Sequence, residues 1–243
     1  ILRVYCLACS APLLDATLYH QYRVCPSCRF HYSLTARERI SLLADPGTFR
    51  ETHRSITSLD PLSFASRVPP RQRLFRDQPR TGLTEAAITG RCAIAGRPVA
   101  LIVLDFRFLG GSMGGVVGEK VSLAFEMATR REMPVVAAIT SGGAGVQEGV
   151  LSLMQMAKTS FAVNGLHQEG LPFVTVMANP TTGQVYSSFA NLADVILAEP
   201  GALLGFAPLQ LLSESSREPL PPGAHTAEAQ LEHGMIDRII DRE

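Results

Sequence analysis

The fold is decided by residues 98–145, which read PVALIVLDFRFLGGSMGGVVGEKVSLAFEMATRREMPVVAAITSGGAG. The apolar run at 98–106 predicts a strand, and a glycine-rich turn follows it. Residues 114–131 carry apolar side chains at helical spacing, and 134–140 form a second apolar run before a second glycine turn. Strand, glycine turn and helix therefore follow one another in a repeating order.

This order extends in both directions along the chain. The further predicted strands cover residues 86–93, 172–178, 194–198 and 235–240, and the further predicted helices cover 35–43, 146–168, 184–192 and 227–232. Residues 45–82 are rich in proline, arginine and serine, and we expect an irregular connection there. Regular alternation of strands and helices favours an α/β fold with mostly parallel strands.

Composition and charge exclude several classes of protein. The chain has 243 residues, 46% of them apolar, which is enough for a sizeable core and argues against general disorder. Its 22 basic and 22 acidic residues give zero net charge, so a globally basic nucleic-acid-binding protein is disfavoured. No apolar run reaches the roughly 18 residues of a membrane helix, and no targeting segment is visible, so we expect a cytoplasmic protein.

Four of the five cysteines lie close together, as Cys6-x2-Cys9 and Cys25-x2-Cys28. Two such pairs supply the four thiolates of a tetrahedral zinc site, so residues 1–34 are predicted to form a zinc ribbon ahead of a larger domain at 35–243. About 35 residues cannot bury a core of their own, and the metal would supply most of their folding free energy. Two disulfides in a secreted mini-domain are the alternative, and Cys92 is expected to be a buried thiol.

Glycines gather at three predicted strand ends: 110–115 (GGSMGG), 141–145 (SGGAG) and 181–183 (TTG). Such turns let backbone N–H groups converge, and two facing turns would make an oxyanion hole for an enolate or a tetrahedral intermediate. The alternative is that these glycines only form tight turns. The sequence contains neither a GxxxxGK[ST] phosphate loop nor a GxGxxG after a strand, which disfavours nucleotide hydrolysis and dinucleotide redox chemistry.

One of these turns also satisfies the G-x-S-x-G pattern of a nucleophile elbow, with Ser112 at its centre. A serine hydrolase would need an acid and a base later in the chain, and Asp194 followed by His225 or His233 has the required order. The pattern is short and the surrounding turns are glycine-rich in general. We therefore rank the hydrolase below the enolate hypothesis.

Longer blocks make a family visible. They are GGSMGGVVGEKV (110–121), SGGAGVQEG (141–149), LSLMQMAKTS (151–160), GLPFVTV (170–176), NPTTGQVYSSFA (179–190), AEPGALLGFA (198–207), LPPG (220–223) and EHGMID (232–237). With the four cysteines, these blocks resemble the β subunit of bacterial acetyl-CoA carboxylase carboxyltransferase over nearly the whole chain. The resemblance implies a crotonase-like spiral of ββα units behind the zinc ribbon.

The resemblance also implies roles for individual residues. The catalytic backbone amides that hold the enolate oxygen are expected at Gly142, Gly143, Ala144, Gly183 and Gln184. Contacts to the acetyl or malonyl thioester are expected from Gly111, Ser112, Met113, Gly114, Thr182 and Phe206. A structural zinc ion is expected on Cys6, Cys9, Cys25 and Cys28.

In that family a separate α subunit and a biotin carboxyl carrier protein complete the enzyme. We therefore expect a hetero-oligomer in which the partner presents biotin, the substrate rides on CoA or an acyl carrier protein, and neither nucleic acid nor membrane is bound.

Three departures from the family pattern fall in expected active-site segments. SGGARMQE becomes SGGAGVQE, with Gly145 and Val146 in place of arginine and methionine. PTxGGV loses its second glycine to Gln184, and GFAGPRVI becomes Gly205–Phe206–Ala207–Pro208–Leu209–Gln210. These changes leave three hypotheses: a biotin-dependent carboxyltransferase subunit, a biotin-independent decarboxylase of malonyl-CoA or malonyl carrier protein, and a non-catalytic assembly or regulatory subunit.

Overall fold

The protein is built around one mixed β-sheet. The computed structural model describes residues 4–58, 70–207, 212, 214–215, 220–221 and 223–243. The strands are β1 (Arg50–Thr52), β2 (Ala87–Ile94), β3 (Arg97–Leu104), β4 (Val135–Ser141), β5 (Phe173–Thr182), β6 (Val195–Ala198), β7 (Leu204–Gly205) and β8 (Arg238–Ile239). In the described part of the chain they follow the order β1-β2-β3-β4-β5-β6-β8, with β7 paired to β5. The pairs among β1, β2 and β3 are antiparallel and all later pairs are parallel, which confirms the prediction.

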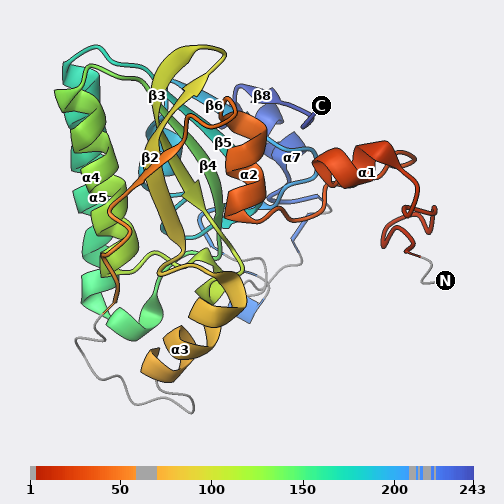
Figure 1. Cartoon of the computed structure of the whole chain (residues 1–243). Coiled ribbons are helices and arrows are strands. Elements are labelled where there is room, and N and C mark those ends of the chain that lie inside the picture. The colour runs from red at the N-terminus through yellow and green to blue at the C-terminus, as the bar shows by residue number, and fades with distance from the viewer. Residues whose placement is uncertain (1–3, 59–69, 208–211, 213, 216–219, 222) are drawn as a thin grey trace.

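Helices cover the sheet on both sides. They are α1 (Thr17–Tyr22), α2 (Ala36–Leu43), α3 (Pro70–Thr81), α4 (Gly115–Arg130), α5 (Val150–Gln168) and α7 (Ala227–Glu232). In Figure 1, α4 and α5 run side by side along one face, whereas α2 and the N-terminal segment lie on the other side. Residues 99–104 of β3 are all buried because both faces of the strand are covered. Within the described residues, no helix has the length and apolar character to cross a bilayer.

The main core forms where α4 packs on the strands. Phe125 of α4 is fully buried and meets Phe173 of β5 edge to face, with ring centroids 4.9 Å apart. Helix α2 begins with the expected capping box, in which Thr35 and Glu38 satisfy each other's backbone N–H groups. The chain thus positions its elements by apolar periodicity and local capping, as the sequence indicates.

The structure corrects four predicted elements. Residues 184–188 form turns and only Phe189–Leu192 form a short 3-10 helix, because Ser188 bonds the Gln184 carbonyl in place of a helical N–H. Helix α5 begins at Val150 rather than 146, since Gly149 has a φ of 53° and interrupts the helix. The connection at 45–82 contains β1 and α3, whose proline and arginine content hid them. Strand β8 covers two residues of the six predicted.

Candidate active site and metal centre

The three glycine turns meet at one edge of the sheet. They follow β3, β4 and β5, which are parallel, so their carboxyl ends share that edge. The first two turns are joined by backbone hydrogen bonds: Met113 N–H donates to Gly143 O at 2.7 Å, and Gly145 N–H donates to Met113 O at 3.0 Å. Gly142 N–H also donates to Gly110 O at 2.8 Å. The turns therefore form one rigid backbone platform.

The second and third turns touch at Gly143 and Gly183. A Cβ added to Gly183 would lie 2.8 Å from the Gly143 Cα, closer than real Cβ contacts allow. Gly183 also has a φ of 65°, which disfavours any residue with a side chain. Glycine is therefore required at this contact for two independent reasons.

The five residues predicted to form the oxyanion hole differ in whether their backbone N–H groups already have a hydrogen-bond acceptor. Gly142 and Gly183 donate to the carbonyls of Gly110 and Gly205, and Gly143 donates to Ser141 Oγ at 3.1 Å. Among the described residues, the N–H groups of Ala144 and Gln184 have no acceptor. Each of these two follows directly after one of the glycines at which the turns touch. The two amides without an acceptor therefore come from the two loops that touch at Gly143 and Gly183.

The side chain of Gln184 points into the protein. Its Nε2 donates to Met113 O at 2.8 Å and to Ser152 O at 2.9 Å, while its Oε1 is buried without a donor among the described residues. Because both neighbours are carbonyls, the amide orientation is fixed. The bulk that replaces the family's glycine is thus accommodated between the first glycine turn and α5.

A pocket of about 490 Å³ opens beside this platform. Of the residues predicted to bind substrate or hold the enolate, it is lined by Ser112, Gly114 and Ala144. The remaining predicted residues do not line it. Gly111, Met113 and Thr182 are buried behind the turns, and Phe206 is exposed beside His225. Pro208–Gln210, the third departure from the family pattern, lie outside the described residues.

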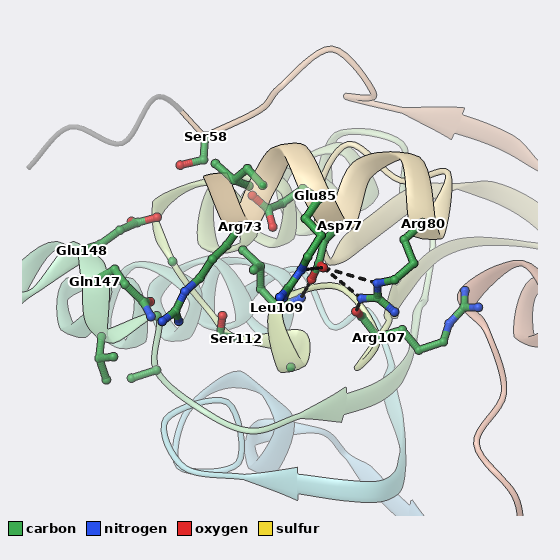
Figure 2. Close-up of a pocket in the computed structure, with 17 residues that line it drawn as sticks. Ser58, Arg73, Asp77, Arg80, Glu85, Arg107, Leu109, Ser112, Gln147 and Glu148 are labelled. Atoms are coloured by element: carbon green, nitrogen blue, oxygen red, sulfur yellow. Dashed lines mark hydrogen bonds and ion pairs between the residues drawn. The ribbon is translucent and has the colours of Figure 1, made fainter. Parts of the chain in front are cut away.

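Helix α3 supplies charged side chains to this pocket. Asp77 is buried, accepts a hydrogen bond from Leu109 N–H at 2.9 Å and pairs with Arg76 and Arg80. Arg73 has no ion-pair partner among the described residues, and Figure 2 shows it extending from α3 toward Gln147 and Ser112. The pocket therefore contains a cation available to an anionic ligand.

Glu85 and Glu148 line the same pocket. Glu148 Oε2 accepts a 2.5 Å hydrogen bond from Gly115 N–H, at the N-terminus of α4. Burial raises the pKa of the Glu85 carboxyl to about 7. Glu148 is thus held in place by a backbone hydrogen bond, whereas the Glu85 carboxyl can exchange a proton near neutral pH.

The residues of the serine-hydrolase hypothesis are not assembled. Asp194 lies near His167 and accepts a hydrogen bond from Phe173 N–H at the start of β5, which is the edge of the sheet opposite Ser112. His225 packs beside Phe206, and His233 bonds the Ala229 carbonyl. Ser112 therefore has neither the acid nor the base that the hypothesis requires.

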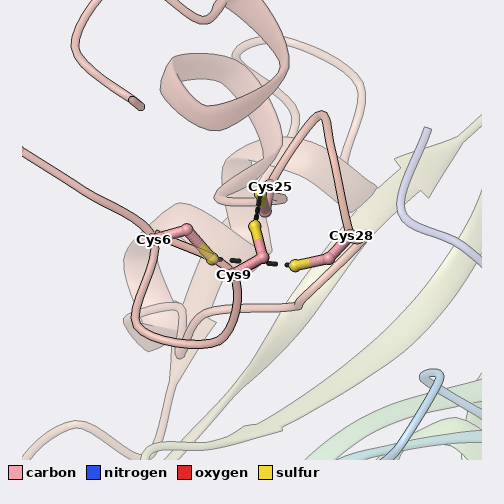
Figure 3. A group of neighbouring side chains, drawn as sticks. All are labelled: Cys6, Cys9, Cys25 and Cys28. Carbon is pink, nitrogen blue, oxygen red and sulfur yellow. Dashed lines mark hydrogen bonds between the residues drawn. The ribbon is translucent and has the colours of Figure 1, made fainter. Parts of the chain in front are cut away.

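The four N-terminal cysteines form one cluster (Figure 3). Their Sγ atoms lie within 4.8 Å of one another, and the Cys6–Cys28 and Cys9–Cys25 Sγ pairs are each 3.7 Å apart. These cysteines are not disulfide-bonded. Four sulfurs about 2.3 Å from a tetrahedral zinc ion lie roughly 3.8 Å from each other, so the cluster fits the ion. With all four positions taken by thiolates, zinc here would stabilise the fold rather than bind substrate.

The N-terminal segment that carries the four cysteines (residues 4–34, the cysteine module) contacts the sheet domain through Arg242. Its guanidinium donates to the carbonyls of Tyr32 at 2.6 Å and Tyr22 at 3.1 Å, and forms a two-pronged ion pair with Glu199. Arg39 of α2 contacts the same carboxylate at 2.5 Å. This buried cluster connects the N-terminal segment, α2 and the chain's C-terminal end.

Sequence reasoning missed Arg73, Asp77 and Glu85. The first two lie on α3, which was expected to be irregular, so no face could be assigned to them. Glu85 lies two residues before a strand whose partner ends at a glycine turn, and that antiparallel register was the signal available.

Comparison with known proteins defines the class. The Carboxyl transferase domain model matches residues 31–214, more than half of the chain. The chain belongs to the carboxyl transferase family.

Its relatives within the family are of one type. It is 46% identical over 98% of its length to the acetyl-coenzyme A carboxylase carboxyl transferase subunit beta of Rubrobacter xylanophilus, covering 91% of that protein. It is 47% identical to the protein of the same name in Thermus thermophilus, with 98% of this chain and 83% of that protein covered. The chain is thus a β-type carboxyltransferase subunit, as the sequence predicted.

Solved structures agree on the fold. The transcarboxylase 12S core, crystallised as a hexamer with methylmalonyl-coenzyme A, matches with a TM-score of 0.71 and 29% identity over 86% of this chain. This chain spans only 39% of that one. The Pseudomonas malonate decarboxylase MdcD-MdcE heterodimer matches with a TM-score of 0.65 and 25% identity, covering 86% of this chain and 79% of that one. The crotonase-like prediction is confirmed.

Proposed function

We propose that this subunit binds an acetyl or malonyl thioester and holds its enolate oxygen between the backbone N–H groups of Ala144 and Gln184. The observation that carries the proposal is the hydrogen bonding of the backbone N–H groups in the glycine turns. These two donors have no acceptor in the part of the chain that the structure describes, and each follows one glycine of the Gly143–Gly183 contact. Backbone donors placed in advance stabilise a developing oxyanion without reorganisation, and removal of one such donor typically costs about 10²–10³-fold in rate.

The carboxyl transfer then needs a second chain. Carboxybiotin on the partner would supply carbon dioxide by cleavage of its N–C bond, and its ureido nitrogen would take up a proton. Loss of a proton from the acetyl methyl group would give the enolate, whose α-carbon would form the new C–C bond of the malonyl thioester. An α-type subunit would present biotin on a carboxyl carrier protein, and this chain would hold the thioester. The relatives named as β subunits support such a hetero-oligomer.

Arg73 is the residue that we assign to the anionic part of the substrate. It lines the pocket beside Ser112, and its charge is not paired among the described residues. Phosphate groups of CoA, the phosphopantetheine of a carrier protein and a malonyl carboxylate all suit a guanidinium. The pocket wall at Gly145 lacks the arginine of the family pattern, which leaves Arg73 a larger share of this task.

A biotin-independent malonyl decarboxylase is the second candidate. It is favoured by Gly145, where a charged residue of the pocket wall is lost, and by the likeness to a malonate decarboxylase. Decarboxylation needs the enolate site but no carboxybiotin. A non-catalytic role is disfavoured because the close Gly143–Gly183 contact is retained in full.

The deciding experiment follows both reactions by mass spectrometry. Malonyl-CoA and malonyl carrier protein are incubated with this chain and its α-type partner, with and without biotinylated carrier. Transfer that requires biotin identifies the carboxyltransferase, and loss of carbon dioxide without biotin identifies the decarboxylase.

Gly183→Ala tests the enolate site in the same assays. Its Cβ would collide with Gly143, so either activity should fall by at least 100-fold. Gly96→Ala is the matched control, because Gly96 also has a positive φ, of 76°, but has open space around it. Equal activity of the two variants would refute the assignment of the site.

A further inference from the structure

Glu85 occupies a position that the proposed reaction has not yet used. It lies two residues before the start of β2, where Ala87 pairs with Leu104 of β3, and Ala86 O accepts a hydrogen bond from Asp105 N–H at 2.9 Å. The first glycine turn begins a few residues after Asp105. Glu85 therefore lies at the same edge of the sheet as the enolate platform, and its side chain lines the adjoining pocket.

The carboxyl group of Glu85 is buried but unpaired. The residue is 6% exposed, and Oε1 accepts only the N–H of Ala86, at 2.9 Å. No cation within the described residues forms a salt bridge with it. Lys120 of α4 is a buried cation, but it donates to Ala87 O at 3.3 Å and to Thr84 Oγ1 at 3.4 Å.

The charges around Glu85 come from three elements. Lys120 on α4 lowers its pKa, and Glu148, near the start of α5, raises it. On α3, Asp77 is already neutralised by Arg76 and Arg80. Burial is the largest influence, and it places the pKa at about 7, where the group can both accept and release a proton.

We propose that Glu85 exchanges a proton with the α-carbon of the bound thioester. The inference rests on the proposed function, since it supplies the proton step of the same enolate site. The Glu85 carboxylate takes a methyl proton, and the C–H electron pair moves into the enolate, whose oxygen is held by the Ala144 and Gln184 amides. In the reverse direction the carboxylic acid returns the proton to the α-carbon after carbon dioxide has left.

The partition between Glu85 and Glu148 follows from their contacts. Glu148 Oε2 is engaged in a hydrogen bond from Gly115 N–H at the first residue of α4. Its side chain also fills the space above Gly114, where an added Cβ would lie 2.4 Å from its Oε1. Glu148 therefore holds the first glycine turn, and Glu85 remains as the proton carrier.

Hydrogen–deuterium exchange tests the proposal directly. Acetyl-CoA is incubated in D₂O with the assembled enzyme, and deuterium in its methyl group is measured by mass spectrometry. Wild-type enzyme should exchange the methyl protons, with a rate that rises with pH through about 7. Glu85→Gln should exchange at least 100-fold more slowly with unchanged affinity for acetyl-CoA, and should lose that rise.

Two further variants keep the result interpretable. Glu85→Asp retains a carboxyl group and should recover part of the exchange, with an altered pH profile. Glu119→Gln, on the outer side of α4 and paired with Lys158, should behave like wild type. Recovery in Glu85→Asp distinguishes a lost proton carrier from a damaged fold.

The failures of the two proposals are distinguishable in the same preparations. Wild-type exchange in Glu85→Gln, or an active carboxyl transferase that exchanges no methyl protons, overturns the role of Glu85 and leaves the enolate site standing. Normal turnover in Gly183→Ala removes the enolate site itself.

Discussion

Glu199 and Glu85 are both buried carboxyl groups, yet their surroundings give them opposite properties. Glu199 is 2% exposed and contacts two guanidinium groups, those of Arg39 and Arg242. Burial alone would raise its pKa, but hydrogen bonds and charge from both arginines outweigh this and lower it. Glu85 is 6% exposed and forms no salt bridge with any described residue, so burial dominates and its pKa rises.

The difference separates structure from chemistry within one protein. A buried carboxylate with two hydrogen-bonded cations stays ionised at all ordinary pH values and fixes the elements around it. A buried carboxyl without a cation changes its protonation near neutral pH, which makes the fold less stable but suits proton transfer. The first lies where the cysteine module meets the sheet domain, and the second lies in the pocket.

Among the changes considered, removal of a bound metal should have the largest effect on stability. Cys6, Leu13 and Cys25 form one small buried cluster in the cysteine module, so we expect its order to depend on a bound ion. Structural zinc contributes about 10–16 kcal/mol in small metal-binding modules. Chelation should therefore unfold the module and release Arg242 from its two carbonyls, as followed by circular dichroism and limited proteolysis.

Elemental analysis gives the matched control for the metal. Cys9→Ser should lose bound zinc, whereas Cys92→Ser, outside the cluster, should retain it. A wild-type preparation that folds without any metal would show that the thiols have another role.

Arg242→Ala removes one of the two cations that pair with Glu199. It leaves Glu199 with Arg39 alone and removes the donor to Tyr22 and Tyr32, and loss of one partner of a buried pair costs about 3–5 kcal/mol. The exposed Arg238→Ala should cost under about 0.5 kcal/mol, both measured by urea denaturation.

The pH dependence of that loss follows from Glu199. Its pKa is lower in the folded protein than in the unfolded chain, so its contribution is present above the ordinary value of about 4.3 and is lost as pH falls through the folded value. The gap between wild type and Arg242→Ala should therefore narrow only under acidic conditions. A gap independent of pH down to about 2 would contradict the assignment of the cluster's stability to Glu199.

Glu85→Gln tests the buried carboxyl without a cation, and its effect on the free energy of unfolding should have the opposite sign. The folded pKa of Glu85 lies above its unfolded value, so its contribution to stability is full below about pH 4.3 and is lost as pH rises through about 7. At pH 8 the variant should be more stable than wild type, by up to about 3 kcal/mol, and at pH 4 the two should be nearly equal. Thermal denaturation at the two pH values measures this, and a variant less stable than wild type at pH 8 would show that the carboxylate is paired.

The sequence predicted the sheet because its apolar runs and glycine turns are local signals. Strands 98–106 and 134–140, the helix at 114–131 and the four cysteines all follow from spacing, and each is present. The Glu199 cluster was not predictable in this way. Arg39, Glu199 and Arg242 are separated by up to 203 positions, and only the folded chain brings them together.

The candidate site divides along the same line. The glycine turns were predicted from the sequence, but only the structure shows that, within its described residues, the Ala144 and Gln184 amides lack an acceptor. The direction of the Gln184 side chain depends on Met113 and Ser152, which are distant in the sequence. Backbone conformation is encoded locally by glycine, whereas the partner of a polar group is decided by tertiary packing.

Gln184→Met should have the smallest effect on stability. It tests a third kind of buried polar group, a neutral amide that is hydrogen-bonded to backbone carbonyls. Gln184 uses both protons of its amide on the carbonyls of Met113 and Ser152, whereas its Oε1 has no donor. Methionine keeps the volume but removes one hydrogen bond from each carbonyl, although Met113 O keeps the bond from Gly145 N–H. We expect a cost of about 1–2 kcal/mol, since the relief of the unpaired Oε1 offsets part of the loss. Gln168→Met, on the exposed end of α5, should leave stability unchanged.

Turnover separates the two consequences of the same change. If the side chain also fixes the Met113 carbonyl, and with it the platform that carries the Ala144 amide, kcat should fall several-fold while KM stays near its wild-type value. Gln184→Gly, which restores the family's residue, frees the loop but keeps the backbone N–H, and should retain more activity than Gln184→Met. A rise in KM without loss of kcat would instead place the Gln184 side chain in substrate binding. The buried amide would then have a functional role, like Glu85, rather than a structural role, like Glu199.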